Sequence, residues 1–365
     1  MNIVSIIMAV FAVIAAIDLM IGNKLGLGKE FEKGINMLGN LVLSMLGMIV
    51  LAPLFVNLLS TPLEAISNVI PVSPSAFIGS ILANDMGGAP ICESMTNGSD
   101  VGYFSGLIIG STMGATVSFT LPFVMGAVDK AQRKNMLLGL LCGICTIPVG
   151  CLIGGLISGL NIVTILINLS PLILLSGILA LGLLVFPKIS VKIFNILGIV
   201  IRVIVIGGLA IGIFEYLTGL DIIPYTAPVV TLEGVTTIFN IACVMAGAFP
   251  LLHIVSTVLK KPLKALSRKI GMNETGTIGF ISTLATSVTT FGMMKDMDDK
   301  SVVLNSAFAV SAAFTLADHL AYTLSFKAEY LPAVTAGKLI SGILAVALAA
   351  IIYKKTSSGE KKLVK

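Results

Sequence analysis

Long apolar stretches recur along almost the whole chain. Each of them reaches the roughly 20 residues that a helix needs to cross the hydrocarbon core of a bilayer. The pattern therefore predicts spanning helices near residues 3–22, 36–60, 101–126, 135–158, 162–186, 193–216, 234–259, 301–326 and 331–353.

Two further apolar segments, near 75–97 and 275–297, are interrupted by polar residues and glycine. The interruptions run from Asn84 to Gly88 and from Thr286 to Gly292. Each flank has only about ten residues, and a helix of that length spans about 15 Å, or half the hydrocarbon core. These segments predict re-entrant hairpins or broken helices.

The two halves of the chain resemble each other. The segment PLEAIS at 62–67 recurs as PLKALS at 262–267, and LAND at 82–85 recurs as LATS at 284–287. We expect one membrane domain, 1–365, that contains an internal duplication. Its parts are a first repeat at about 36–158, linking helices at 162–216, a second repeat at about 234–353, and a cytoplasmic tail at 354–365.

The basic residues predict how these segments are oriented, since Lys and Arg concentrate on the cytoplasmic side. If neither interrupted segment crosses, nine spanning helices put the N-terminus outside and the C-terminus inside, with Lys327 nearly alone outside. If both cross, the cluster Lys130, Arg133 and Lys134 moves outside. The re-entrant arrangement therefore fits better.

This orientation makes the two repeats inverted. The arm 61–74 carries no basic residue and lies outside, whereas its counterpart 260–271 carries five and lies inside. Inverted repeats with broken helices near the midplane are typical of secondary transporters. We therefore expect an all-α polytopic membrane protein of this architecture, with its site where the two hairpins meet.

Composition agrees with a protein surrounded by lipid. Of 365 residues, 56% are hydrophobic and 11% are charged, whereas soluble domains have about 25% charged residues. We expect no nucleic-acid partner. The histidines are His253 and His319, and no HExxH or other metal-ligand cluster is present, so the sequence predicts no enzyme, no metal and no cofactor.

Asp85 is the first candidate for binding chemistry. A charge at the membrane centre costs about 2.5–3.5 kcal/mol on insertion scales, so it has a partner or a function. Asp85 can form an anionic site for a cationic substrate or coupling ion. Alternatively, it caps the free N–H groups of a half-helix.

The second interruption offers the hydroxyls of Thr286, Ser287, Thr289 and Thr290. They can bind a polar substrate or satisfy the unwound backbone. Phe291 beside them can face a cation or simply pack.

Three other features lie on the expected helices. Asp318 and His319 are adjacent within 301–326, and neighbours on a helix do not share a face, so we do not expect both to touch one ligand. The pair can relay protons or form an interhelical hydrogen bond. Arg202 should pair with a carboxylate or a carbonyl.

Small residues spaced by four should pack each hairpin against the helix after it; they are Gly106, Gly110, Gly114, Ala307, Ser311 and Thr315.

Three motifs resemble the ethanolamine utilisation permease family over about residues 30–350. They are NDMGG at 84–88, FGMMKDMD at 291–298, and FAVSAAF at 308–314 followed by Asp318-His319-Leu320. The resemblance implies a permease of the bacterial inner membrane that admits ethanolamine. It also implies a pathway that includes ethanolamine ammonia-lyase in a microcompartment.

Ethanolamine suits the expected site. We expect Asp85 to hold its ammonium and the hydroxyls at 286–290 to hold its alcohol. Asn84, Gly87 and Gly88 complete the first interruption, and the glycines would let the backbone approach the substrate. Three alternatives stay open: a cation or proton antiporter, an intramembrane enzyme, and a docking protein of the microcompartment. The linking helices lead us to expect a homodimer.

Overall fold

The computed structural model describes residues 3–229 and 232–363, apart from the side chains of 44, 125–127, 130, 187–188, 191, 194–195, 232–233, 259–261, 263–270 and 356–363. Within these ranges every regular element is a helix. The basic arm predicted at 260–271 and the tail after 355 therefore fall largely among side chains outside the description.

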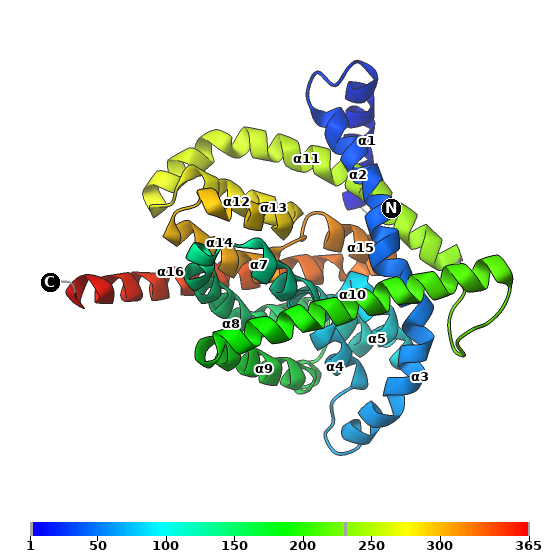
Figure 1. The fold of residues 1–365 in the computed structure, drawn as a ribbon. Coiled ribbons are helices and arrows are strands. Elements are labelled where there is room, and N and C mark those ends of the chain that lie inside the picture. The colour runs from blue at the N-terminus through cyan, green and yellow to red at the C-terminus, as the bar shows by residue number, and fades with distance from the viewer. Residues whose placement is uncertain (1–2, 230–231, 364–365) are drawn as a thin grey trace.

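The first two helices form a hairpin that projects from the bundle (Figure 1). They are α1 (Ile3–Met20) and α2 (Leu27–Leu41). The buried carboxylate of Asp18 accepts hydrogen bonds from the backbone N–H groups of Leu25, Leu27 and Gly28 at 2.8, 2.9 and 3.1 Å. Asp18 thus satisfies donors that the start of α2 leaves free. The chain continues through the π-helical turn η1 (Val42–Leu46) into α3 (Gly47–Ser67).

The first interrupted segment is broken, as predicted. It consists of α4 (Pro74–Ile81), the turn η2 (Asn84–Gly88) and α5 (Ala89–Met95). A helical run follows, formed by α6 (Asp100–Tyr103), η3 (Phe104–Gly114), η4 (Thr116–Thr120) and α7 (Leu121–Ala127). Because η3 and η4 are π-helical, this run is wider than an α-helix.

Small residues pack the first interrupted segment against this wide run, which confirms the prediction from glycine spacing. A β-carbon at Gly114 would collide with the carbonyl oxygens of Leu82 and Gly79, and one at Gly106 would crowd Ala89. In the second half, α12 also packs closely on α14, at Gly276 and Gly279, where a β-carbon would meet Ser301 and Asn305. Ala307 lies against Gly139 and Gly143 of α8, and Ser311 bonds to Ser341 of α16.

Four long helices follow, after the short turn η5 (Lys130–Gln132). Helices α8 (Arg133–Ile157) and α9 (Ile162–Val185) lie together, and α10 (Pro187–Thr218) crosses one face of the molecule (Figure 1). Helix α11 (Leu232–Ile270) contains Pro250 and Pro262 and arches over the second interrupted segment. That segment comprises α12 (Glu274–Ala285), α13 (Ser287–Gly292) and η6 (Met294–Asp296).

The helix predicted over 301–326 is wrong as a continuous element. Helix α14 (Asp299–Ala312) ends before an unwound segment at 313–317, and α15 (Asp318–Lys327) begins after it. Phe314 has a positive φ of 63°. The N–H groups of Phe314 and Leu316 donate to the carbonyls of Thr283 and Leu284 at 3.1 and 2.9 Å, so the end of α12 replaces the helical hydrogen bonds. The turn η7 (Ala328–Tyr330) and α16 (Leu331–Leu363) complete the chain.

Eight helical runs in the described part of the chain are long and apolar enough to cross a membrane, one fewer than predicted. The missing one is 301–326, because its break leaves α14 too short. The eight runs are Ile3–Met20, Gly47–Ser67, Asp100–Val124, Arg133–Ile157, Ile162–Val185, Ile196–Thr218, Gly234–Val258 and Asp318–Lys355.

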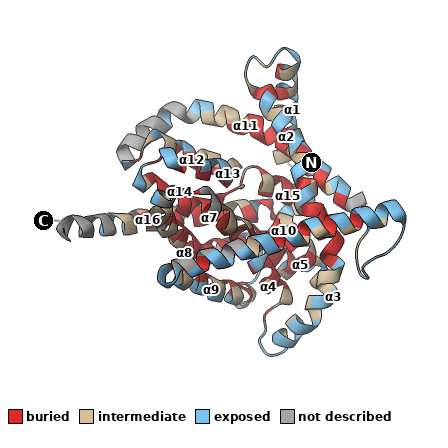
Figure 2. Ribbon diagram, viewed as in Figure 1, coloured by how far each residue is buried: buried red, intermediate tan, exposed pale blue. Residues whose placement is uncertain are grey.

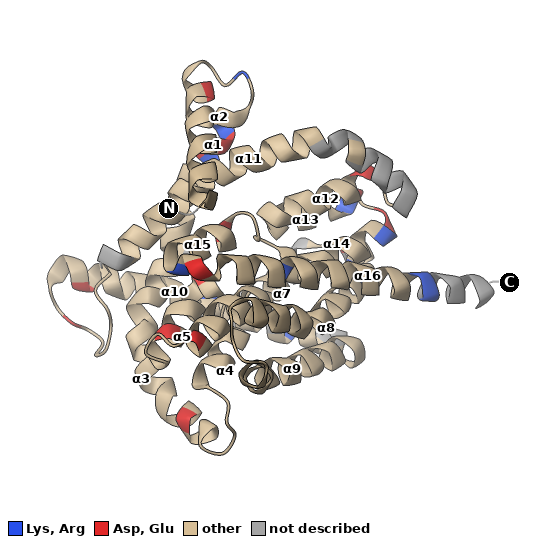
Figure 3. Ribbon diagram, turned by 180° about the vertical axis from the view of Figure 1, so that it is seen from behind, with Lys and Arg blue, Asp and Glu red and all other residues tan. Residues whose placement is uncertain are grey.

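Buried residues concentrate in the centre of the bundle, where α8 packs on α14 and α16 (Figure 2). Large apolar side chains on α1, α9 and α10 are exposed, among them Val13, Leu174 and Val203. Such a surface suits lipid rather than water. Charged residues lie mainly at the ends of the bundle (Figure 3).

Candidate functional site

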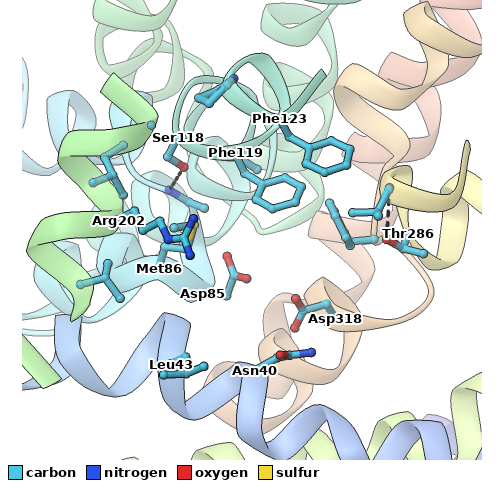
Figure 4. Close-up of a pocket in the computed structure, with 18 of the residues that line it drawn as sticks. Asn40, Leu43, Asp85, Met86, Ser118, Phe119, Phe123, Arg202, Thr286 and Asp318 are labelled. Carbon is cyan, nitrogen blue, oxygen red and sulfur yellow. Dashed lines mark hydrogen bonds between the residues drawn. The ribbon is translucent and has the colours of Figure 1, made fainter. Parts of the chain in front are cut away.

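A cavity of about 870 Å³ opens between α2, the turn η2, η4 and α7, α10, and the start of α15. Most of its wall is apolar. Figure 4 shows the side chains that line it. Its polar lining is formed by Asn40, Asp85, Ser118, Arg202, Thr286, Asp318 and His319.

Asp85 reaches this cavity because η2 is not a regular helical turn. Gly87 has a φ of 90°, and Met86 is also outside the helical region. The N–H groups of Met86 and Gly88 both donate to the carbonyl of Ala83. The chain therefore turns sharply at mid-segment and leaves the Asp85 side chain 13% exposed at the cavity wall.

Asp318 and His319 both line the same cavity, although neighbours within a helix point to different faces. The reason is the break at 313–317, which places both residues at the first turn of α15. His319 Nε2 lies 3.9 Å from Asp85 Oδ1. The second interrupted segment also shapes the site through its backbone, because α12 holds the unwound segment that precedes α15.

The carboxylates of Asp85 and Asp318 point toward each other from opposite walls (Figure 4). The two carboxyl groups lie within hydrogen-bonding distance of each other. Among the described residues, Oδ1 of each is nevertheless buried without a hydrogen-bond partner, as is Nδ1 of His319. Buried acceptors without donors are unfavourable. A ligand that brings N–H donors and a positive charge would satisfy both carboxylates.

Three aromatic rings line the cavity beside the carboxylates. Phe119 stacks on Phe123 with ring centres 5.6 Å apart, and it meets Phe314 edge-on at 5.5 Å. Phe119 and Phe123 come from η4 and α7, whereas Phe314 comes from the unwound segment. Ring faces attract cations, so this wall has the same preference as the carboxylates.

The sequence profile of the family described as "Ethanolamine utilisation protein, EutH" matches residues 1–352. The chain belongs to the EutH family. Together with the eight apolar helical runs, membership makes it a multi-pass membrane protein, and relatives in the family are named as probable permeases, not as enzymes.

Relatives of this EutH-family chain match over nearly its full length. The "Probable ethanolamine permease EutH" of Listeria monocytogenes is 41% identical and covers 100% of the chain and 98% of the relative. The protein of the same name in Escherichia coli is 33% identical, with 99% and 97% covered. The uncharacterized protein YxeR of Bacillus subtilis is 37% identical, with 98% and 96% covered. No solved structure matches the chain.

The glycines and Asn84 of the first interruption do not line the cavity. A β-carbon at Gly87 would press on Met48, and one at Gly88 would press on the carbonyls of Leu82 and Ala83. These glycines therefore allow packing of the turn, which was not the role predicted for them. Asn84 is fully buried, and its amide has no hydrogen-bond partner in the described part of the chain.

In the second interruption, Thr286 lines the cavity and the other predicted residues do not. Thr290 bonds to Thr283 at 2.8 Å and to the carbonyl of Gly279 at 3.1 Å, so it ties α13 to α12. Ser287 is buried and Thr289 is exposed outside the cavity. Phe291 packs on Phe123 with ring centres 6.3 Å apart.

Two cations were not among the predicted site residues. Arg202 of α10 lines the cavity on the side of Asp85 (Figure 4). Lys338 of α16 is 2% exposed, donates to the carbonyl of Ser111, and lies within electrostatic range of Asp85. The sequence could have identified Lys338, because it is a charged residue within the apolar stretch 331–353 and charges inside the membrane mark functional sites. In the described residues no three His, Cys, Asp or Glu side chains form a metal-binding group.

Proposed function

We propose that the protein is a permease that imports ethanolamine across the bacterial inner membrane, with its binding site in the cavity between η2 and α15. One observation carries this proposal above the others. Two carboxylates with unused acceptor atoms, Asp85 and Asp318, face each other inside a mainly apolar cavity. The names of the relatives supply the substrate.

The ammonium of ethanolamine would lie between these carboxylates. It carries three N–H donors, and Asp85 and Asp318 offer acceptors from opposite sides. Charge-assisted hydrogen bonds in such a site are stronger than neutral ones. The faces of Phe119 and Phe314 would add cation–π attraction, worth about 0.5–2 kcal/mol.

The alcohol of ethanolamine would reach Thr286. The hydroxyl of Thr286 accepts from the N–H of Val288 at 3.3 Å and keeps its own proton for a ligand. Ser118 is less suited, because its hydroxyl already donates to Gly114 and accepts from Ala83. The binding role thus rests on Thr286 alone among the hydroxyls predicted at 286–290.

Alternating access is the mechanism that we propose for transport. The cavity of about 870 Å³ is far larger than a ligand of four heavy atoms, so it must narrow to enclose ethanolamine. Unwound backbone at 313–317 and at η2 supports such a movement, because non-helical segments absorb changes of φ and ψ. The inverted repeat would supply the second state by exchanging the conformations of the two halves.

The orientation that we propose has the N-terminus outside and the C-terminus inside. It requires an odd number of crossings, so we propose that one further segment crosses in addition to the eight apolar helical runs. The Asp and Glu residues near α3, α5 and the end of α10 lie at the end of the bundle opposite to the lysines that close α16 (Figure 3). This segregation supports a cytoplasmic end at α16. We also propose a homodimer, for which the exposed apolar face of α9 and α10 is the support.

Uptake of labelled ethanolamine into proteoliposomes tests the function. We expect saturable uptake that close amino alcohols inhibit and that simple alcohols without an amine do not. The control is liposomes that contain no protein. Uptake equal to that control, from protein shown to be folded, would refute the proposal.

A further inference from the structure

A lysine ammonium in the dry core of the bundle is the feature that the binding site leaves unexplained. Lys338 is 2% exposed, although it lies eight residues into α16. Burying a charge is costly unless it is paired and hydrogen-bonded. Lys338 therefore either has a function, or a neighbouring negative charge compensates its positive charge.

The surroundings of Lys338 Nζ leave an ammonium incompletely bonded. Its hydrogen-bond partner in the described part of the chain is the carbonyl of Ser111 in η3. An ammonium has three N–H donors, whereas a neutral amine has two and a lone pair. The charged form therefore depends on the electrostatic field around it more than on hydrogen bonds.

That field comes from few groups. Asp85 of η2, Cys151 of α8 and His319 of α15 lie within electrostatic range of Lys338. The neighbouring helix α14 offers Ser311, which bonds to Ser341. The charged residues of α14, Asp299 and Lys300, lie at the start of that helix. This is about 18 Å along the helix axis from Ser311 at 1.5 Å per residue, so they are remote from Lys338. Asp85 is therefore the anion that balances Lys338.

The same Asp85 is the proposed anchor of the substrate ammonium, so two cations compete for one carboxylate. Asp85 and Asp318 supply at most two negative charges, and the positive charges of Arg202 and Lys338 already cancel these. A bound substrate cation adds a charge that nothing in the cavity balances. Arg202 cannot release a proton, and the low dielectric makes the excess charge expensive.

We propose that Lys338 is the internal counter-cation of the binding site, and that it gives up one proton when a substrate ammonium binds. This inference rests on the proposed function. The N–H bond of the Lys338 ammonium breaks, the electron pair stays on Nζ, and the proton passes to water in the cavity. His319 lines the cavity, lies within electrostatic range of Lys338, and has an Nδ1 without a hydrogen-bond partner among the described residues, which can accept the proton on the way.

The consequence is electroneutral transport. If one ammonium moves inward bound to the site and one proton moves outward on Lys338, the net transfer equals that of the neutral amine. Such a permease needs no inorganic coupling cation, because Lys338 takes up a proton again when the substrate leaves and so balances the charge of the empty site. Membrane potential would then leave the uptake rate unchanged.

Calorimetry on the purified full-length protein tests the proton release. Ethanolamine is titrated at neutral pH in two buffers that differ in ionisation enthalpy, which gives the protons released per ligand bound. We expect about one proton for the wild type by linkage. We expect release near zero for Lys338→Met, and wild-type release for the control Lys327→Met, because Lys327 is a partly exposed lysine outside the cavity.

Affinity separates this role from a structural one. Lys338→Met removes the competing cation and should bind ethanolamine about tenfold more tightly, whereas Lys338→Arg fixes a cation there and should bind about tenfold more weakly. A purely structural lysine would weaken binding in both variants. Proton release by Lys338→Met equal to that of the wild type would overturn the proposal.

Uptake by wild-type proteoliposomes gives a test that needs no variant. A potassium diffusion potential set with valinomycin should not change the initial rate of ethanolamine uptake. Uptake driven by an inside-negative potential would overturn the role of Lys338 while leaving the permease function intact. If the wild type binds no ethanolamine at all, the proposed function itself fails, and this inference fails with it.

Discussion

At the scale of single residues, the site depends on a few charges placed in apolar surroundings. Asp85, Asp318 and His319 meet at one cavity, and Arg202 and Lys338 balance the carboxylates. Burying any one of these charges without its partner would be strongly destabilising. Their arrangement is therefore the part of the molecule most sensitive to substitution.

Replacing Asp85 by Asn should abolish measurable uptake and leave insertion intact. The change removes the charge that holds the ammonium, and hydrogen bonds to charged groups are worth about 1.5–3 kcal/mol, or at least about tenfold in binding. The measurement is initial uptake at equal amounts of membrane-inserted protein. Glu64→Gln is the control, because Glu64 is an exposed carboxylate on α3. Wild-type uptake by Asp85→Asn would contradict the assignment.

Replacing Phe119 by Leu should raise the KM for ethanolamine about 2- to 30-fold, since a cation–π contact contributes about 0.5–2 kcal/mol. Uptake rates over a range of concentrations give the KM. The matched control is Phe280→Leu, whose ring packs on Phe308 with centres 5.2 Å apart and does not line the cavity. An equal rise in both variants would mean that aromatic packing, and not the cation, explains the effect.

At the scale of elements, close packing positions the two broken segments. The tip of the first lies on η3 through Gly79 and Gly114. The second holds the unwound segment 313–317 through backbone hydrogen bonds from Phe314 and Leu316. Side-chain hydrogen bonds fix the end of the first broken segment. Tyr103 of α6 donates to Glu93 of α5 at 2.7 Å, and Tyr330 of η7 donates to Asp100 of α6 at 2.9 Å.

Gly114→Ala should lower thermal stability in detergent, because the added methyl group meets the carbonyls of Leu82 and Gly79. Overpacking of this kind costs about 1–3 kcal/mol. The control is Gly177→Ala in α9, where a β-carbon meets nothing within 4 Å and Ala favours the helix by up to about 1 kcal/mol. Equal melting temperatures for the two variants would show that the contact has no role in stability.

At the scale of the whole molecule, the exposed apolar helices and the segregated charges determine how the protein sits in a bilayer. Lipid must cover α1, and lipid or a second protomer must cover α9 and α10, because apolar side chains of all three helices are exposed. The cavity is built from elements of both halves, so a relative movement of the halves would open it to one side and then to the other. The orientation of the halves is the part of this mechanism that is simplest to test.

Cysteine labelling checks the inverted repeat. In a background with all five native cysteines replaced, Ile66→Cys should react with an impermeant reagent added outside, and Leu266→Cys should react only from inside. The expected difference follows from the basic residues at 260–271. The control is the cysteine-free protein, which should not react. Labelling of both positions from the same side would exclude inverted repeats.

The sequence by itself determined the membrane class, most of the spanning helices and the first interruption. Each of these depends on local chemistry: an apolar run favours a helix in lipid, and Asn84-Asp85-Met86-Gly87-Gly88 interrupts one. It also singled out Asp85, Asp318 and His319 as candidates, because charged or titratable residues within apolar segments stand out without any knowledge of their neighbours.

Only the tertiary structure decided where α14 ends and which side chains share the cavity. The stretch AFTLA at 313–317 has no Gly, Pro or charge, so its pattern is that of an unbroken helix. It unwinds because the carbonyls of Thr283 and Leu284 replace its helical hydrogen bonds. Arg202, Phe119 and Lys338 join Asp85 from distant parts of the chain, since packing of helices against one another brings them there and no local pattern encodes that contact.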